Sequence, residues 1–106
     1  MAPLKFALKD AAAALGKASD DFVTLMHEDT TRVLLFAPRG EDTQTPHTQD
    51  EVYVVMSGHG QFRRREEVVD FVAGDVLFVP AKVVHRFENF SDDLVTWVIF
   101  FGTRKT

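Results

Sequence analysis

Two of the four histidines in this chain lie in segments whose residue types and spacing could bind a metal ion. His47 precedes Glu51 by four residues, in a segment that runs from Gly40 to Gly58. His85 lies in a second segment, from Gly74 to Asn89. Neutral imidazole and carboxylate are donors that divalent transition metals favour. Metal binding is therefore the chemistry that these residues suggest first.

The two segments together resemble the paired motifs of the cupin superfamily, which are glycine-bracketed β-hairpins carrying metal-binding histidines and a glutamate. The segments read GEDTQTPHTQDEVYVVMSG and GDVLFVPAKVVHRFEN. The resemblance covers roughly residues 33–101 and is nearest to small single-domain cupins. It implies that His47, Glu51 and His85 are metal ligands.

The motifs depart from the family pattern at two positions. Thr45 stands where the family commonly has a further histidine, and Lys82 stands where it usually has a turn glycine. A neutral alcohol is a poor metal donor, so the alternatives for a fourth ligand are water, Thr45 itself, and the amide oxygen of Gln44 or Gln49. The loss of one imidazole is expected to weaken metal binding, and it leaves open a site that holds no metal.

Two imidazoles and a carboxylate form the facial triad of non-haem iron(II) oxygenases. This donor set does not select among iron, manganese, nickel, copper and zinc. Side chains of like parity on a strand share one face, which places five residues of the first motif on the interior face: Thr45, His47, Glu51, Tyr53 and Val55. On the partner strand, the same argument places His85 and Phe87 inside.

Further side chains are candidates for contact with a substrate. Tyr53, the only tyrosine, is a candidate acid–base group, and the alternative is a core residue with its hydroxyl at the rim. Arg64 shares its parity with Phe62, so it is a candidate for holding a substrate carboxylate unless it is exposed. The aromatic residues expected to line the mouth of the barrel are Phe36, Phe78, Phe87 and Trp97. His59, between two glycines, is expected to be an exposed turn residue, and His27 has no organised surroundings.

These residues must be positioned by a helical segment and a larger β part. Residues 4–15, rich in Ala, Leu and Lys, are predicted to form a helix that ends at Gly16, within an N-terminal segment 1–18. Eight short apolar runs are predicted to be strands: 22–28, 32–37, 51–56, 61–65, 68–72, 76–79, 85–89 and 94–101. The turns between them are too short for crossover helices. The predicted fold is all-β, an antiparallel barrel or jelly roll over 22–101 in a single domain 1–106, and the resemblance specifies the double-stranded β-helix of cupins.

The last predicted strand is apolar on both of its faces, with Thr96 as the exception. A strand with one solvent-exposed face would alternate polar and apolar side chains, so this strand is expected to be covered on both faces. The cover on its outer face would be the N-terminal helix or a second subunit. A homodimer is therefore expected.

Composition excludes several classes of function. The chain has 106 residues, of which 45% are hydrophobic and 26% charged, so it can form one core. It has no cysteine, which excludes disulfides, thiolate nucleophiles and iron–sulfur clusters. Its 16 acidic and 12 basic residues argue against a nucleic-acid partner. No apolar segment or leader indicates a membrane or secretion, so a cytoplasmic protein is expected.

The function expected from these features is that of a small metal-binding cupin that accepts a small organic ligand in its barrel. If it is an enzyme, the donor set suits oxygenase-type chemistry or isomerisation of a small carbonyl, enol or phenolic compound. The alternative is a non-enzymatic binding protein with a degenerate or empty metal site. A purely structural subunit is a third reading, supported only by the apolar last strand.

Overall fold

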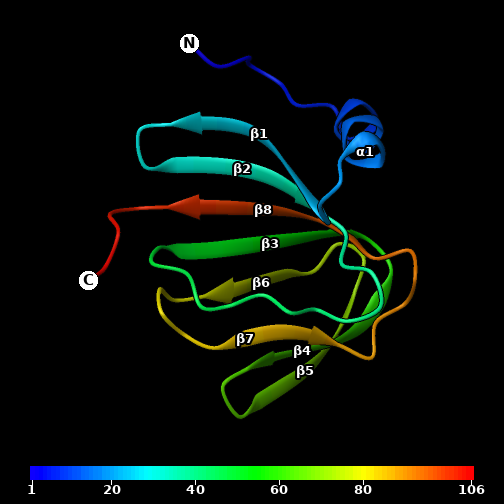
Figure 1. Cartoon of the computed structure of the whole chain (residues 1–106). Coiled ribbons are helices and arrows are strands. Elements are labelled where there is room, and N and C mark those ends of the chain that lie inside the picture. The colour runs from blue at the N-terminus through cyan, green and yellow to red at the C-terminus, as the bar shows by residue number, and fades with distance from the viewer.

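The computed structural model describes residues 1–106, which form one helix and eight strands. The elements are α1 (Leu8–Lys17), β1 (Phe22–Glu28), β2 (Thr31–Phe36), β3 (Asp50–Ser57), β4 (His59–Arg64), β5 (Glu67–Val72), β6 (Val76–Val79), β7 (His85–Glu88) and β8 (Val95–Phe101). They form two antiparallel sheets, with strand orders β1-β2-β8-β3-β6 and β5-β4-β7 (Figure 1). The predicted all-β jelly roll with one short helix is confirmed. The two sheets do not close into a continuous barrel, because β6 and β7 are not paired.

Alternation along the strands selects which side chains lie between the sheets. In β8, Thr96, Val98 and Phe100 are buried, whereas the residues between them are half-buried. The register places Phe100 between Arg32 on β2 and Glu51 on β3. One row across the inner face of the larger sheet therefore carries a cation, an aromatic ring and a carboxylate.

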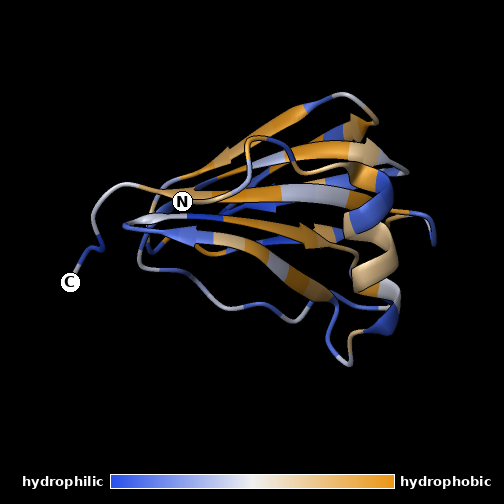
Figure 2. Cartoon of the chain, turned by 90° about the horizontal axis from the view of Figure 1, so that it is seen from above, coloured by the Kyte–Doolittle hydropathy of each residue, from blue (hydrophilic) through white to orange (hydrophobic).

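Aromatic rings fill the space between the two sheets. Phe87 on β7 lies 4.8 Å from Phe62 and 5.3 Å from Phe71, measured between ring centroids. Tyr53 of the opposite sheet packs edge-on against Phe87 at 5.0 Å. Phenylalanine suits this position because its ring needs no hydrogen-bond partner. The strands carry most of the apolar residues of the chain, whereas the C-terminal tail is hydrophilic (Figure 2).

The helix begins later than its composition predicts. Leu4 is fully exposed, whereas Ala11 and Leu15 are buried against Leu35 of β2. A helical turn without packing is marginal in water, so α1 forms only where an apolar surface meets it. Gly16 lies inside the helix, where a Cβ would meet no other part of the chain within 4 Å, and the helix ends at Lys17.

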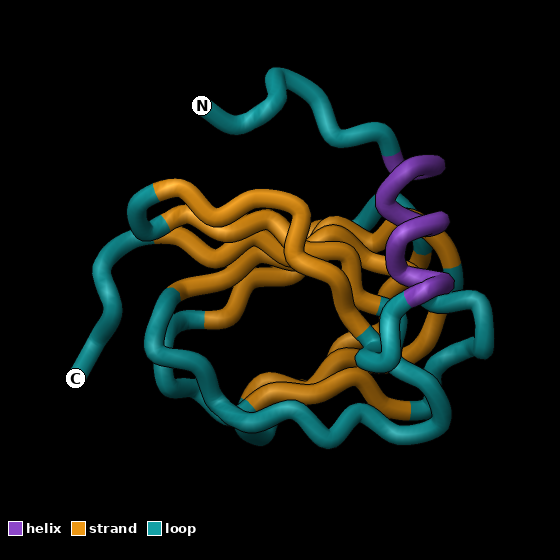
Figure 3. Tube along the Cα trace, turned by 45° about the horizontal axis from the view of Figure 1, so that its top comes forward, coloured by secondary structure: helices purple, strands orange, loops and turns teal.

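This helix covers one end of the outer face of the larger sheet (Figure 3). Val95 and Trp97 of β8 pack against the cluster that Ala11 and Leu15 form with Leu35. The expectation that α1 covers the last strand is thus met at this end. Trp97 lies under the helix and does not line the space between the sheets, which corrects its predicted place at the mouth of the barrel.

The homodimer stays a prediction. No helix of the structure is both long and apolar enough to cross a membrane.

The turn between β3 and β4 requires a glycine for two reasons. Gly58 has a φ of +92°, and a Cβ there would lie 2.7 Å from the Cα of Leu94. We expect Gly58→Ala to lower the free energy of unfolding by about 2–4 kcal/mol, measured by urea denaturation. Gly74→Ala is the control, because Gly74 has a similar φ of +96° but nothing within 4 Å of its Cβ position. Equal losses in the two variants would contradict a contribution from the contact with Leu94.

Candidate metal centre

Three separate parts of the fold bring His47, Glu51 and His85 together. Glu51 is the second residue of β3, and His85 is the first residue of β7 in the opposite sheet. His47 lies in the segment that connects β2 to β3. One nitrogen or oxygen atom from each of the three side chains lies within 4.8 Å of the others. The chain thus gathers two imidazoles and a carboxylate in the space between its sheets.

The pair formed by Glu51 and His85 is almost fully buried. Their exposed fractions are 1% and 2%, and Oε1 of Glu51 lies 2.8 Å from Nε2 of His85. The other ring nitrogen, Nδ1, lies 2.8 Å from the carbonyl oxygen of Val83. A carbonyl can only accept, so Nδ1 carries a proton and Nε2 faces the carboxylate. Metal-binding histidines are commonly held in this way.

This close pair does not satisfy the hydrogen-bonding capacity of its own atoms. Both carboxylate oxygens of Glu51 and Nε2 of His85 are buried without an aligned hydrogen-bond partner, although Oε1 and Nε2 are close. Burying polar atoms without partners is costly, and the charge attraction of the pair offsets only part of that cost. A divalent cation would satisfy all three atoms. The residues present therefore fit a metal ion.

The surroundings shift the pKa values of the two imidazoles in opposite directions. Burial lowers the pKa of His47, and the neighbouring His85 and Arg32 reinforce this against the opposing charge of Glu51. Burial also acts to lower the pKa of His85, but the contact with Glu51 and the bond to Val83 outweigh it, so this pKa is raised. His47 is therefore neutral at neutral pH, as a metal ligand must be. The contact with Glu51 favours the protonated ring of His85, whereas a metal ion binds the neutral ring, so metal binding at His85 is expected to weaken as the pH falls.

Of the side chains named as alternatives for a fourth ligand, Gln44 is the one that lies next to His47. Its Nε2 donates to Oδ2 of Asp42 at 2.7 Å, which turns its Oε1 towards the site. That oxygen lies 3.2 Å from Nε2 of His47 and accepts a hydrogen bond from the hydroxyl of Tyr53 at 3.1 Å. Asp42 is itself buried and also accepts from the backbone N–H groups of Gln44 and Phe87. Asp42 therefore fixes which end of the Gln44 amide faces the histidine.

The other two alternatives for a fourth ligand lie elsewhere. Thr45 is exposed, and Gln49 donates to the carbonyl oxygens of Thr30 and Gly102. The expectation that Thr45 and His47 share a strand face with Glu51 is wrong, because β3 begins only at Asp50. Within β3 the predicted shared interior face is confirmed for Glu51, Tyr53 and Val55, which are all buried.

Tyr53 remains a phenol at neutral pH. It is 1% exposed, and its burial, followed by the charge of Glu51, raises its pKa well above the usual value. Its hydroxyl can therefore donate a hydrogen bond but is poorly suited to accept a proton as a base. The structure narrows the predicted acid–base role of Tyr53 to hydrogen-bond donation.

A cavity of about 220 Å³ adjoins His47 and Tyr53. Apolar side chains provide most of its wall, and Arg32 and Gln44 are among its polar residues. The lining residues are Phe22, Thr24, Arg32, Leu34, Phe36, Gln44, His47, Tyr53, Val98 and Phe100. Phe36 was predicted to line the site, whereas Arg32 and Leu34 were missed. Both could have been found from the alternation of side chains along a strand, because Arg32, Leu34 and Phe36 share one face of β2.

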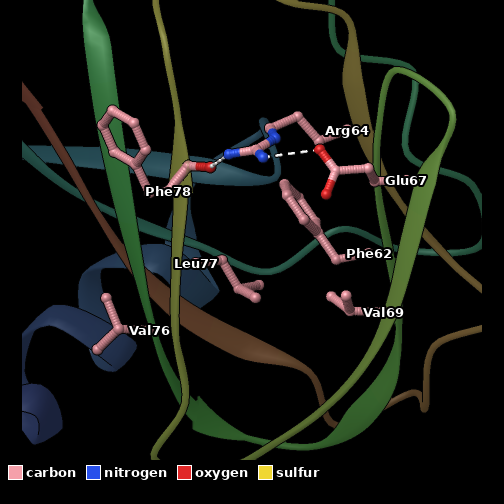
Figure 4. Close-up of a pocket in the computed structure, with 7 residues that line it drawn as sticks. All are labelled: Phe62, Arg64, Glu67, Val69, Val76, Leu77 and Phe78. Atoms are coloured by element: carbon pink, nitrogen blue, oxygen red, sulfur yellow. Dashed lines mark hydrogen bonds and ion pairs between the residues drawn. The ribbon is translucent and has the colours of Figure 1, made fainter.

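Three residues predicted to contact substrate are positioned elsewhere. Phe87 is 2% exposed and fills the core, and Phe78 is 46% exposed on the face of β6 that points away from the core. Arg64 pairs with Glu67 at 2.8 Å and donates to the carbonyl oxygen of Phe78 at 3.2 Å. Figure 4 shows this arrangement, with the Phe78 ring pointing away from Phe62. Arg64 thus has a carboxylate partner within the chain and lines a different pocket. His27 and His59 are exposed and take no part in the cluster.

Comparisons with known proteins agree with this fold. The family model described as "Cupin domain" matches residues 32–101. An uncharacterized protein of Streptomyces coelicolor is 44% identical over 59 residues, which are 56% of this chain and 56% of that protein. The match thus spans little more than half the length of that relative.

Two solved structures illustrate the likeness in fold. A cupin-2 domain containing protein from Shewanella frigidimarina has a TM-score of 0.69 at 20% identity, covering 89% of this chain and 91% of its own. A DMSP lyase, DddQ from Ruegeria pomeroyi, has a TM-score of 0.65 at 18% identity, covering 80% of this chain and 48% of its own. At these identities the likeness concerns the fold alone.

Proposed function

This chain belongs to the cupin family, and we propose that it binds one divalent transition-metal ion through His47, Glu51 and His85. The ion would face the adjoining cavity, which accepts a small organic ligand. Iron, manganese, nickel, copper and zinc are all compatible with this donor set.

The observation that carries the proposal is the group of buried polar atoms that lack an aligned hydrogen-bond partner. Three of the atoms that would face the ion belong to Glu51 and His85, and all three are buried without an aligned partner. A site that had become structural would be expected to satisfy these atoms with hydrogen bonds or to replace them with apolar groups. Their retention in a core of otherwise apolar side chains favours a cation as the missing partner.

The surrounding residues supply binding and orientation. A metal ion in this site would supply Lewis acidity, which polarises an oxygen of the ligand. Gln44, held by Asp42, presents an oxygen to His47 and is the side chain best placed to supplement the three ligands. Tyr53 holds a proton on its hydroxyl and positions Gln44. Phe36, Val98 and other apolar wall residues limit the access of water.

If the protein is an enzyme, oxygen chemistry or isomerisation of a small carbonyl, enol or phenolic compound suits this site. One fold supports many activities, so the lyase among the structures with this fold does not assign lyase activity here.

Metal binding is expected to raise the melting temperature. With free Ni²⁺, Mn²⁺ or Zn²⁺ at about 100 times the dissociation constant, the rise should be roughly 10 °C or more, because the ion binds only the folded chain. A chelator should reverse the rise, and elemental analysis should find one ion per chain. Mg²⁺ is the control, since it prefers oxygen ligands and retains its water. If no transition metal changes the melting temperature but small organic ligands raise it, the non-enzymatic alternative with an empty metal site is favoured.

A further inference from the structure

Arg32 occupies a place in the cavity that the metal site does not explain. It lies on β2 beside Phe100, which in turn lies beside Glu51 in the same row of the larger sheet. Its side chain lines the same cavity as His47. A molecule in that cavity can therefore reach both residues.

The guanidinium group of Arg32 is held in place but is not neutralised. Its central carbon lies 4.3 Å from the centroid of the Phe100 ring, and its Nη2 donates to the amide oxygen of Gln49 at 3.2 Å. Gln49 is itself fixed by hydrogen bonds to Thr30 and Gly102. None of the ion pairs in the structure includes Arg32. Its Nε is buried and has no hydrogen-bond partner.

The electrostatic surroundings leave room for a negative charge. Burial lowers the pKa of Arg32, and the nearby Arg104 lowers it further, against the attraction of Glu51. Two cationic groups are therefore close enough to repel each other. An anion bound at Arg32 would relieve that repulsion, and a neutral ligand would not.

We propose that Arg32 binds a carboxylate of the ligand, so that the ligand is a small carboxylic acid with an apolar body about the size of one ring. This inference rests on the proposed function, because it identifies the class of molecule that the same cavity holds beside the metal ligands. A planar guanidinium stacked on a ring keeps its N–H groups in its own plane, and those that do not bond to Gln49 remain available to a carboxylate, a group that arginine can bind through two parallel hydrogen bonds.

The volume and lining of the cavity indicate the size and polarity of the rest of the ligand. A cavity of roughly 150 Å³ in another protein takes up benzene, so the 220 Å³ here suits a ring with one or two small substituents. Phe22, Leu34 and Phe36 offer such a body an apolar wall. The carboxylate end would lie at Arg32, and a second polar group would face His47 and Gln44.

The test compares acids with their neutral amides of the same shape. Calorimetric titrations of metal-free and of metal-loaded protein give the affinity for each acid and for its amide. The pairs are benzoate and benzamide, phenylacetate and phenylacetamide, and hexanoate and hexanamide. The wild-type chain is expected to bind at least one acid about 10- to 100-fold more tightly than its amide in both forms. Arg32→Gln should remove that preference. Arg104→Gln, which removes an equal charge from a residue that does not line the cavity, should retain most of it.

The failures of the two proposals are distinguishable. If no acid is preferred to its amide in the wild-type chain, or if Arg32→Gln keeps the preference, the inference about Arg32 is overturned while metal binding can still be measured. If no metal binds, the preference in the metal-free protein still decides the role of Arg32. NMR of the Arg32 Nε–H group in the wild-type chain gives a measurement that does not depend on a variant folding. Its resonance should shift on addition of the preferred acid and stay in place with the amide.

Discussion

Replacement of His85 by alanine is expected to reduce the metal content from one ion per chain to a negligible amount. The imidazole of His85 is buried, and its orientation is set by the bond from Nδ1 to Val83. Its removal takes away one of the three proposed protein ligands and leaves the Glu51 carboxylate without the ring nitrogen that lies 2.8 Å from its Oε1. Because even outer-shell partners of a metal ligand contribute 10- to 100-fold to affinity, the loss of a ligand should weaken binding by roughly 100-fold or more. Elemental analysis and competition with a coloured chelator measure the effect.

Two further variants keep this prediction decisive. His27→Ala is the matched control, because His27 is exposed and lies outside the cluster. It should keep full metal content. Glu51→Gln serves if His85→Ala fails to fold, since it changes the charge and donor strength of the side chain with little change in shape. Stoichiometric metal retained by folded His85→Ala or by Glu51→Gln would contradict the proposed centre.

Replacement of Phe87 by alanine is expected to lower the free energy of unfolding by about 3–5 kcal/mol. Phe87 is 2% exposed and touches aromatic rings of both sheets, so its truncation leaves a cavity that the rings cannot readily fill. Denaturation with urea gives the change, provided that the slope of the transition stays constant.

Phe78→Ala is the matched control for this prediction. Phe78 is a phenylalanine of the same motif, but it is 46% exposed. Its truncation should cost about 1 kcal/mol or less, as is usual for exposed positions. If the two truncations had similar small effects on stability and Phe87→Ala instead weakened ligand binding, Phe87 would be a ligand contact and its assignment to the core would be wrong.

The strands were largely predictable from the sequence because their pattern is local. Short runs of β-branched and aromatic residues between turn residues placed all eight strands, with ends that differ by a few residues. The resemblance that the two motifs carry also implied His47, Glu51 and His85 as metal ligands. The helix was predicted less well, since Leu4 has the composition of the helix but no surface to pack against.

The wider site could not be predicted because it depends on distant partners. The alternation of side chains along a strand shows which residues share a face but not which face is covered. Phe78 and Trp97 were therefore expected at the mouth of the barrel, although Phe78 is exposed and Trp97 packs under α1. Nothing in the sequence distinguishes the surroundings of Arg64 from those of Arg32. Only the fold pairs Arg64 with the carboxylate of Glu67 and leaves Nε of Arg32 without a hydrogen-bond partner. Similarly, Gln44 faces His47 only because Asp42 holds the opposite end of its amide.

The amino-acid sequence by itself determined the strand pattern, because that pattern depends on residue type and short-range spacing. Its two motifs also carry the family resemblance that implies His47, Glu51 and His85 as the side chains that could hold a metal ion. The tertiary structure alone decided which charges stay unpaired and which rings fill the core. Those properties depend on the residues that meet across the two sheets, and contacts between distant segments are set by packing and solvent exclusion over the whole chain.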